Sequence, residues 1–269
     1  MAPPQSSAPA IALRGTSYRV PGGPALVDSL SLEIPVGATL VLLGRSGCGK
    51  TTTLRLMNRL LEPTAGDLLI EGRPVKEWDL IRLRRRMGYA IQDVGLFPHY
   101  TVERNIGLLP AVEGWPAVRI RERVRELLAL VGLDDSLVSR FPRELSGGQR
   151  QRVGVARALA LDPPVLLMDE PFGALDALTR AELQGEFARL QQRLGKTVVL
   201  VTHDLREALL LGSQIALLEA GHLAGLYTPE EFQRTSDPPA LAYRNAFSAP
   251  NRGTAQPLPP PPRRSGDPA

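Results

Sequence analysis

The clearest chemistry in this chain lies in eight consecutive residues, which read Gly-Arg-Ser-Gly-Cys-Gly-Lys-Thr at positions 44–51. Three glycines let successive backbone N–H groups face one anionic centre. Lys50 can then reach the β- and γ-phosphates of a nucleotide, and the Thr51 hydroxyl can ligate Mg²⁺. Residues 39–43 form an apolar run typical of a strand, and residues 51–61 have the apolar spacing of a helix. The segment therefore predicts a site for a nucleoside triphosphate.

A second set of candidate residues stands at the ends of three other apolar runs. Asp169 and Glu170 follow one run, Gln92 follows another and His203 a third. In phosphate-loop ATPases a strand-end aspartate orients Mg²⁺, so Asp169 takes that role and Glu170 faces the attacking water. Gln92 could contact both the metal and the water. A histidine at the carboxyl end of a parallel strand points into the region where ligands bind.

Each of these residues also has a plainer explanation. An apolar run followed by two acids is an ordinary strand-to-turn boundary, and a lone histidine is more often structural than functional. Asp176 either belongs to the site or caps the helix expected at residues 177–194. The order of these residues after the phosphate loop favours the functional interpretation.

Length and composition fit one globular enzyme subunit. The 269 residues suit a single large domain or two intimate subdomains, and the one cysteine, Cys48, excludes an internal disulfide and suits a reducing cytoplasm. No apolar run approaches the roughly 18 residues that span a bilayer, and no signal peptide is expected at the start. The net charge of +4 comes without an aromatic-interleaved basic patch, so no nucleic-acid partner is expected. The arginine-rich residues 82–86 favour a solvated helix face.

The alternation of patterns predicts an α/β fold: a phosphate-loop NTPase core with a parallel sheet flanked by helices, a small antiparallel β region and a helical subdomain. Strands are expected within residues 11–34, around a turn at 21–24, and at 39–43, 68–70, 165–168 and 197–201. Helical patterns cover residues 102–133, 145–161 and 177–194. The expected domain spans residues 11–248, with the helical subdomain at about 93–160, between disordered tails at 1–10 and 249–269.

Residues 145–149 read Leu-Ser-Gly-Gly-Gln, a much rarer string than the phosphate loop. A helix N-terminus that bears Ser-Gly-Gly is an anion site. Over about residues 11–245 the chain resembles the nucleotide-binding subunits of ATP-binding-cassette (ABC) transporters. In the terms of that family the motifs are Walker A at 44–51, the Q-loop at Gln92, the signature at 145–149, Walker B at 165–170, the D-loop at Asp176 and the switch histidine His203.

The resemblance implies a head-to-tail dimer that encloses two ATP molecules with Mg²⁺. The catalytic residues would be Glu170, His203, Gln92 and Lys50, and the metal would be held by Thr51, Gln92 and Asp169. One subunit would contact the nucleotide through Gly44, Arg45, Ser46, Gly47, Cys48, Gly49, Lys50, Thr51, Thr52 and Tyr18, and the other through Ser146, Gly147 and Gly148, with Gln149 and Asp176 completing the set. Family members usually have an adenine-stacking aromatic where this chain has Val20, so Tyr18 stacks only if the turn shifts in register.

The resemblance also implies partners and a location. An integral-membrane permease would hold the chain at the cytoplasmic face of the cell membrane, and a periplasmic or extracellular solute-binding protein would act indirectly. The groove that receives a cytoplasmic helix of the permease is expected in the helical lobe, with Gln92 at its hinge and Phe97 and Tyr100 just beyond. The chain departs from the family pattern at Ala177, where proline often stands, and no paired regulatory domains are expected after His203.

A finer resemblance is to bacterial importers of quaternary amines. It is carried by residues 89–99, 103–110, 149–159 and 195–208. It implies an osmoprotectant cargo such as glycine betaine, choline, carnitine or proline. A different solute or lipid, or a non-transport ABC ATPase, stays open as an alternative because the cassette does not encode the cargo. Two non-transport classes fit the sequence less well. A chromosome-maintenance ATPase would need a long coiled coil between Lys50 and Ser146, where no sustained heptads occur. A translation factor would carry two cassettes, and this sequence contains one.

The lone thiol lies inside the phosphate loop. Converging N–H groups, Lys50 and a helix N-terminus predict a depressed pKa for Cys48 and therefore a reactive thiolate. The plainer alternative is a small buried residue with an inert thiol.

Overall fold

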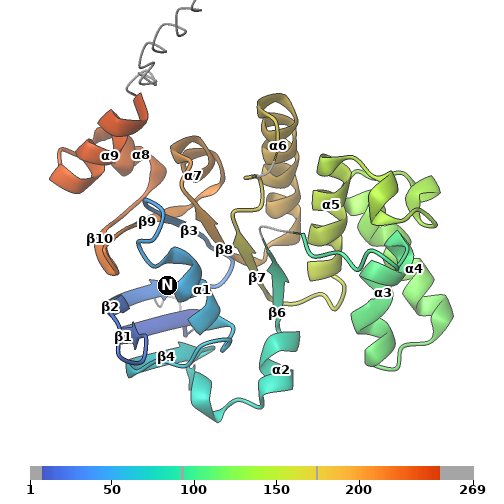
Figure 1. Cartoon of the computed structure of the whole chain (residues 1–269), viewed down its shortest axis with the longest axis horizontal. Helices are drawn as coiled ribbons and strands as arrows, with labels where there is room; N and C mark the ends of the chain where they lie inside the picture. Colours follow the sequence, from blue (N-terminus) through green and yellow to red (C-terminus); the bar gives the residue numbers. More distant parts are fainter. Residues whose placement is uncertain (1–7, 92–93, 174, 249–269) are drawn as a thin grey trace, which may run out of the picture.

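A six-stranded sheet forms the centre of the chain (Figure 1). The computed structural model describes residues 8–91, 94–173 and 175–248. The strand order is β10-β9-β3-β8-β7-β6, parallel throughout except that β10 pairs antiparallel with β9. The strands are β3 (Thr39–Leu43), β6 (Met87–Ala90), β7 (Val165–Asp169), β8 (Thr197–Thr202), β9 (Gln214–Glu219) and β10 (His222–Tyr227).

Both faces of this sheet are buried, which explains why its strands are continuous apolar runs rather than alternating ones. Successive side chains of β3 enter opposite cores because a strand has a two-residue period. Leu40 and Leu42 pack with helix α1 (Lys50–Met57), whereas Val41 and Leu43 pack with α5 (Gly147–Ala158), α6 (Ala177–Leu194) and α7 (Leu205–Leu211). The expected parallel sheet flanked by helices is thereby confirmed.

The small antiparallel region is a separate four-stranded sheet of order β2-β1-β4-β5. Its strands are β1 (Ile11–Arg19), β2 (Ala25–Ile34), β4 (Ala65–Ile70) and β5 (Arg73–Pro74), so the turn expected at residues 21–24 lies between β1 and β2. It packs on the α1 side of the central sheet, and its buried residues join the same core as Leu54, Leu56 and Met57. Helix α2 (Leu80–Arg85) follows a short 3-10 turn, η1 (Val75–Glu77), and carries the arginine-rich segment on its exposed side.

The helical lobe stands to one side of the sheet in Figure 1. The single helical pattern at residues 102–133 is in fact two helices, α3 (Val102–Val112) and α4 (Ala117–Leu130). They separate because Gly114 adopts a positive φ of 74° and Pro116 caps α4. Two 3-10 turns, η2 (Asp135–Leu137) and η3 (Pro142–Glu144), then lead into α5. Helices α8 (Pro229–Arg234) and α9 (Pro238–Ser248) lie at the opposite side, beside β10.

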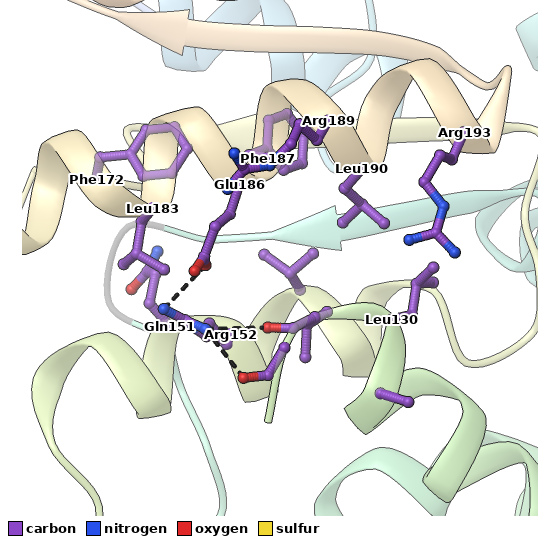
Figure 2. Close-up of a pocket in the computed structure, with 14 residues that line it drawn as sticks. Leu130, Gln151, Arg152, Phe172, Leu183, Glu186, Phe187, Arg189, Leu190 and Arg193 are labelled. Carbon is purple, nitrogen blue, oxygen red and sulfur yellow. Dashed lines mark hydrogen bonds and ion pairs between the residues drawn. The ribbon is translucent and has the colours of Figure 1, made fainter. Parts of the chain in front are cut away.

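The lobe and the core meet along α6, where an apolar cavity of about 310 Å³ lies between α4, α5 and α6 (Figure 2). Arg152 of α5 spans this seam. One of its Nη atoms donates to the backbone carbonyls of Val131 (3.4 Å) and Gly132 (3.1 Å), and the other lies 2.9 Å from a carboxylate oxygen of Glu186 on α6. Figure 2 shows Arg152 between the two sides. A single arginine thus ties the signature helix both to its own lobe and to the core.

No helix within the described parts of the chain is both long and apolar enough to cross a membrane.

Candidate nucleotide site

The site is assembled at the carboxyl ends of three adjacent strands. Strand β8 lies between β3 and β7, with Leu43 opposite Thr202 and Asp169 opposite Val201. The phosphate loop, the two acids and His203 each follow one of these strand ends, so sheet topology alone brings them together. The phosphate loop therefore meets two segments that follow it by more than a hundred residues at one edge of the sheet.

The phosphate loop needs its glycines for two different reasons. Gly47 and Gly49 have φ values of 81° and 102°, which L side chains rarely adopt. A side-chain carbon at Gly44 would lie 2.5 Å from the carbonyl oxygen of Leu218, and one at Gly49 would lie 2.4 Å from that of Leu26. The backbone is therefore held tightly from two sides. Helix α1 begins at Lys50 without a side-chain cap, which leaves its first N–H groups pointing toward the loop.

Lys50 is buried, and its ammonium donates to the backbone carbonyls of Gly44 (2.8 Å) and Arg45 (2.9 Å). These carbonyls belong to the loop itself, so the ammonium closes the concave side of the loop. Both acceptors are neutral, and a phosphate oxygen would be a stronger partner for the same charge. The candidate residues Arg45, Ser46 and Gly47 are exposed along the loop.

Thr51 and Asp169 form the candidate metal pair. The Thr51 hydroxyl donates to Oδ1 of Asp169 at 2.9 Å, across from α1 to the end of β7. Two neighbouring ligands about 2.1 Å from an octahedral Mg²⁺ lie about 3 Å apart, so this separation suits adjacent coordination positions. Burial raises the pKa of the Asp169 carboxyl, the Thr51 hydrogen bond opposes that change and the charge of Glu170 adds to it. The oxygen donors and their spacing fit Mg²⁺, which also relieves the cost of a buried carboxylate.

Glu170 and His203 are in direct contact. His203 Nδ1 lies 3.3 Å from Oε1 of Glu170, and the histidine side chain is more exposed (54%) than the glutamate side chain (19%). Glu170 has a φ of 44°, an unusual conformation for a residue with a side chain, and its N–H donates to the carbonyl of Val201 at 2.9 Å. The strained backbone at the end of β7 thus turns the carboxylate toward the end of β8.

The signature begins helix α5, and Ser146 is the N-cap. Its hydroxyl accepts from the N–H of Gln149 (3.2 Å), and the Gln149 side chain accepts from the N–H of Ser146 (2.9 Å), a capping box. Gly148 is packed so closely that a side-chain carbon would lie 3.0 Å from Thr179. In Figure 1, α5 lies beyond β7 and α6 from β3 and α1. Helix α5, which the signature begins, therefore lies apart from α1, which follows the phosphate loop.

The other candidate residues occupy several different places. Asp176 is the N-cap of α6, accepting from the N–H of Thr179 at 3.1 Å, and this bond lowers the pKa of its carboxyl. The capping role weighed for it is confirmed. Tyr18 is half-buried on β1 beside the core that contains α1, and adenine stacking by this residue stays a prediction. Thr52 lies in the first turn of α1. Gln92 lies outside the described residues.

The predicted depression of the Cys48 pKa is wrong. Burial raises the pKa of this thiol, and the Lys50 ammonium, 3.9 Å from the sulfur, opposes the shift without overcoming it. Cys48 is only 7% exposed and packs into the core beneath the loop. The sequence argument considered the charges around the thiol and not the desolvation that removes its anion from water. Burial and the raised pKa favour the alternative of a small buried residue with an inert thiol.

We expect Cys48 to react slowly with a maleimide at pH 7, more slowly than free cysteine does. A raised pKa keeps the thiol protonated at neutral pH, so the labelling rate should rise only as pH climbs above the ordinary range near about 8.5. Mass spectrometry of the folded protein over a pH series measures this rate. Cys48→Ser, which keeps every backbone N–H of the loop, provides the unlabelled control. Fast single labelling at pH 7 would restore the reactive interpretation.

Some residues of the site carried no sequence signal. The Thr202 hydroxyl donates a hydrogen bond to the Glu207 carboxylate, which also accepts one from the Gln184 side chain at 2.9 Å. The same hydroxyl oxygen accepts a hydrogen bond from the N–H of Asp204 at 2.9 Å. This buried group holds the backbone on either side of His203. Tyr243 of α9 also reaches His203. No motif spacing marks these residues, because they act through packing brought about by the fold.

The fold and the site together define a phosphate-loop NTPase with a signature-bearing helical lobe. A family model described as ABC transporter matches residues 27–173, and the chain belongs to this family. The glycine betaine/carnitine/choline transport ATP-binding protein OpuCA of Bacillus subtilis is 51% identical over 213 residues, which cover 79% of this chain and 56% of that protein. The chain spans little more than half of the first curated relatives it matches, from 54% to 59%.

Solved structures agree with this placement. The structure of cbiO1 from Clostridium perfringens, part of the ABC transporter complex cbiONQ, has a TM-score of 0.79 at 26% identity and covers 86% of this chain and 92% of its own. A dimeric, post-hydrolysis state of the ATP-binding cassette MJ0796, bound to ADP and Pi, has a TM-score of 0.72 at 32% identity and covers 81% of this chain and 98% of its own. The resemblance stated from the motifs is confirmed.

Proposed function

We propose that this chain is the ATP-hydrolysing subunit of an ABC importer for osmoprotectant quaternary amines. The observation that carries the proposal is the joint placement of the phosphate loop, Asp169, Glu170 and His203 at one sheet edge, in a chain 51% identical to a glycine betaine/carnitine/choline transport ATP-binding protein. The cargo would be glycine betaine, choline or carnitine. The subunit would work at the cytoplasmic face of the cell membrane.

In this proposal each residue of the site has one task. The loop N–H groups and Lys50 would bind the β- and γ-phosphates, while Thr51 and Asp169 would hold Mg²⁺, whose charge would offset that of the phosphate oxygens. Glu170 accepts a proton from the attacking water, and His203 contacts the γ-phosphate and keeps Glu170 oriented. Gln92 adds a contact to the metal and the water.

The geometry favours a head-to-tail dimer as the active form. Helix α5, which begins with the signature, and α1, which follows the phosphate loop, lie apart in one chain (Figure 1). A second copy, turned around, would bring its Ser146, Gly147 and Gly148 to the γ-phosphate bound at the first loop, and the helix N-terminus would supply the donors. ATP would therefore join the two subunits, and hydrolysis would release them. The dimeric structure of the MJ0796 cassette supports self-association of two such chains.

A groove between the core and the helical lobe fits the membrane partner. Its volume is about 580 Å³, and it is lined on one side by α2 and β6 and on the other by α3 and α5. Ile81 (59% exposed), Phe97 (40%) and Val112 (67%) together present apolar surface to solvent in this groove. Exposed apolar surface of this kind is typical of a protein-binding site. An ion pair between Arg85 and Glu113 links the two sides. A short amphipathic helix from the cytoplasmic side of a permease would cover this surface.

Phe97→Arg should uncouple transport from ATP hydrolysis. A charged side chain in the apolar groove would oppose docking of the permease helix, while the nucleotide site keeps all its residues. We expect uptake to fall at least about tenfold, as for the loss of a buried interface anchor, with the ATPase rate of the isolated subunit unchanged. Val36→Arg is the matched control, because Val36 is also apolar and 66% exposed but stands before β3, at the edge of the sheet opposite the site. Equal uptake by both variants would place docking elsewhere.

Tyr100, the other residue expected at this groove, does not line it. Its ring packs on His99 (4.4 Å between centroids) and under the guanidinium of Arg104 (3.8 Å). Tyr100→Arg would therefore disturb the loop that carries Phe97 rather than the groove itself.

The decisive experiment is purification of the chain with the membrane protein it binds, followed by reconstitution in vesicles with internal ATP and Mg²⁺. Uptake of labelled glycine betaine, choline and carnitine is then compared with that of proline. ATP-dependent uptake of one of the quaternary amines supports the proposal. ATP hydrolysis without uptake of any of them would assign the chain to another ABC transporter, and absence of hydrolysis would reject the enzymatic role.

A further inference from the structure

The C-terminal helix α9 reaches the nucleotide site through one side chain. The Tyr243 hydroxyl donates to the backbone carbonyl of His203 at 2.8 Å. The same face of α9, at Pro239, Ala242 and Tyr243, lines a cavity of about 300 Å³ whose other walls are residues 45–48 of the phosphate loop and 217–220 at the end of β9. One helix thus borders the loop and bonds the switch histidine.

Helix α9 is firmly held, so Tyr243 is a fixed support. Ala240 is completely buried in the core that also contains Val41, Leu43 and residues of α5, α6 and α7. Arg244 donates from its two Nη atoms to the carbonyls of Phe232 (2.8 Å) and Thr235 (2.6 Å), which ties α9 to the end of α8. The Tyr243 ring itself packs against the same core. A hydroxyl on such a helix can define the position of its acceptor.

His203 needs such a support more than its neighbours do. Its side chain is 54% exposed and contacts Glu170. Thr202 is buried and bonded to Glu207, and Asp204 caps α7 by accepting from the N–H of Arg206 at 2.7 Å. The backbone is therefore fixed before and after His203. The Tyr243 hydrogen bond fixes the His203 carbonyl between these two points. It thereby also fixes the backbone orientation from which the imidazole extends toward Glu170.

The hydroxyl remains a donor under all ordinary conditions. Burial raises the pKa of Tyr243 to about 12, and the nearby negative charges of Asp204 and Glu170 add to the effect. The proton is therefore present at neutral pH.

We propose that Tyr243 is a positioning residue for His203: its hydrogen bond to the His203 carbonyl holds the imidazole against Glu170, so that the docking of helix α9 controls the rate of ATP hydrolysis. The inference rests on the proposed ATPase function. Tyr243 acts through the backbone of His203, whose carbonyl accepts its hydrogen bond.

Tyr243→Phe tests the hydroxyl while keeping the ring. We expect kcat for ATP hydrolysis to fall about fivefold, the typical loss for one hydrogen bond, with KM for ATP changed by less than about twofold. In the His203→Ala background the same substitution should have no further effect on the rate, because there is no imidazole left to position. Tyr227→Phe is the matched control for the loss of a buried tyrosine hydroxyl, since Tyr227 packs on Phe232 and its hydroxyl is hydrogen-bonded to Asp237 rather than to the His203 carbonyl.

Proton NMR of the ring signals gives a readout that does not depend on turnover. The chain has three histidines, His99, His203 and His222, so comparison with His203→Ala identifies the His203 signal. Tyr243→Phe should shift and broaden that signal and leave the other two in place, while Tyr227→Phe should move none of them. This selectivity separates positioning of His203 from a general loss of stability.

The outcomes are distinct. A selective change of the His203 signal with a lower kcat supports the inference. An unchanged His203 signal, an unchanged kcat or equal movement of all three histidine signals overturns it. A wild-type chain that does not hydrolyse ATP overturns the proposed function instead, and the NMR comparison still decides whether Tyr243 positions His203.

Discussion

Replacing Glu170 by Gln should nearly abolish ATP hydrolysis and leave ATP binding intact. The amide keeps the size and hydrogen-bonding reach of the carboxylate but cannot accept the proton of the attacking water. Loss of a general base lowers the rate by about 10² to 10⁴. The nucleotide contacts of the loop, Lys50 and Thr51 do not involve Glu170. The variant should therefore accumulate as an ATP-bound dimer.

Two measurements check this expectation. A phosphate-release assay gives the rate, and size-exclusion chromatography with and without ATP gives the dimer. Glu33→Gln is the control, because Glu33 is an exposed glutamate on the small sheet with a loose ion pair to Arg14 at 3.9 Å. If Glu170→Gln hydrolyses ATP at nearly the rate of the Glu33 control, another group is the base and Glu170 has a different role.

The parts of the fold that sequence predicts well are those with strong local patterns. The run of residues 165–168 is a strand because a buried parallel strand is continuously apolar, and residues 177–194 form α6 over the expected range because Asp176 caps its start and Gly195, with φ of 59°, ends it. The phosphate loop follows from its glycines and its strand and helix. Strand order is a long-range property that the motifs did not predict, and the structure places β8 between β3 and β7.

The parts that sequence missed depend on tertiary contacts. Trp115 lies between α3 and α4, where a single helix was expected, because the break depends on one glycine with positive φ and one proline. The pKa of Cys48 was predicted with the wrong sign because burial cannot be seen in a motif. Tyr243 has no spacing relation to the phosphate loop, and its role follows only once α9 is packed beside β10.

Lys50→Ala should weaken nucleotide binding and not turnover alone. In the structure the ammonium bonds the carbonyls of Gly44 and Arg45, and on binding it would exchange these neutral acceptors for charged phosphate oxygens. Hydrogen bonds to charged groups contribute about 1.5–3 kcal/mol, so Kd for Mg-ATP should rise by about 10- to 100-fold. Calorimetric titration with Mg-ATP measures Kd directly.

The substitution also removes the donor that closes the loop, so a second variant is needed to separate charge from loop shape. Lys50→Met keeps the buried aliphatic stem and loses only the ammonium. Because the backbone N–H groups and the start of α1 are unchanged in both variants, we expect both to bind Mg-ATP equally weakly. In Glu170→Gln, by contrast, ATP binding should be kept and hydrolysis lost. The Lys50 variants therefore test nucleotide binding, and the Glu170 variant tests the hydrolysis step. A Lys50→Met protein that binds Mg-ATP as tightly as the wild type would show that backbone N–H groups alone hold the phosphates.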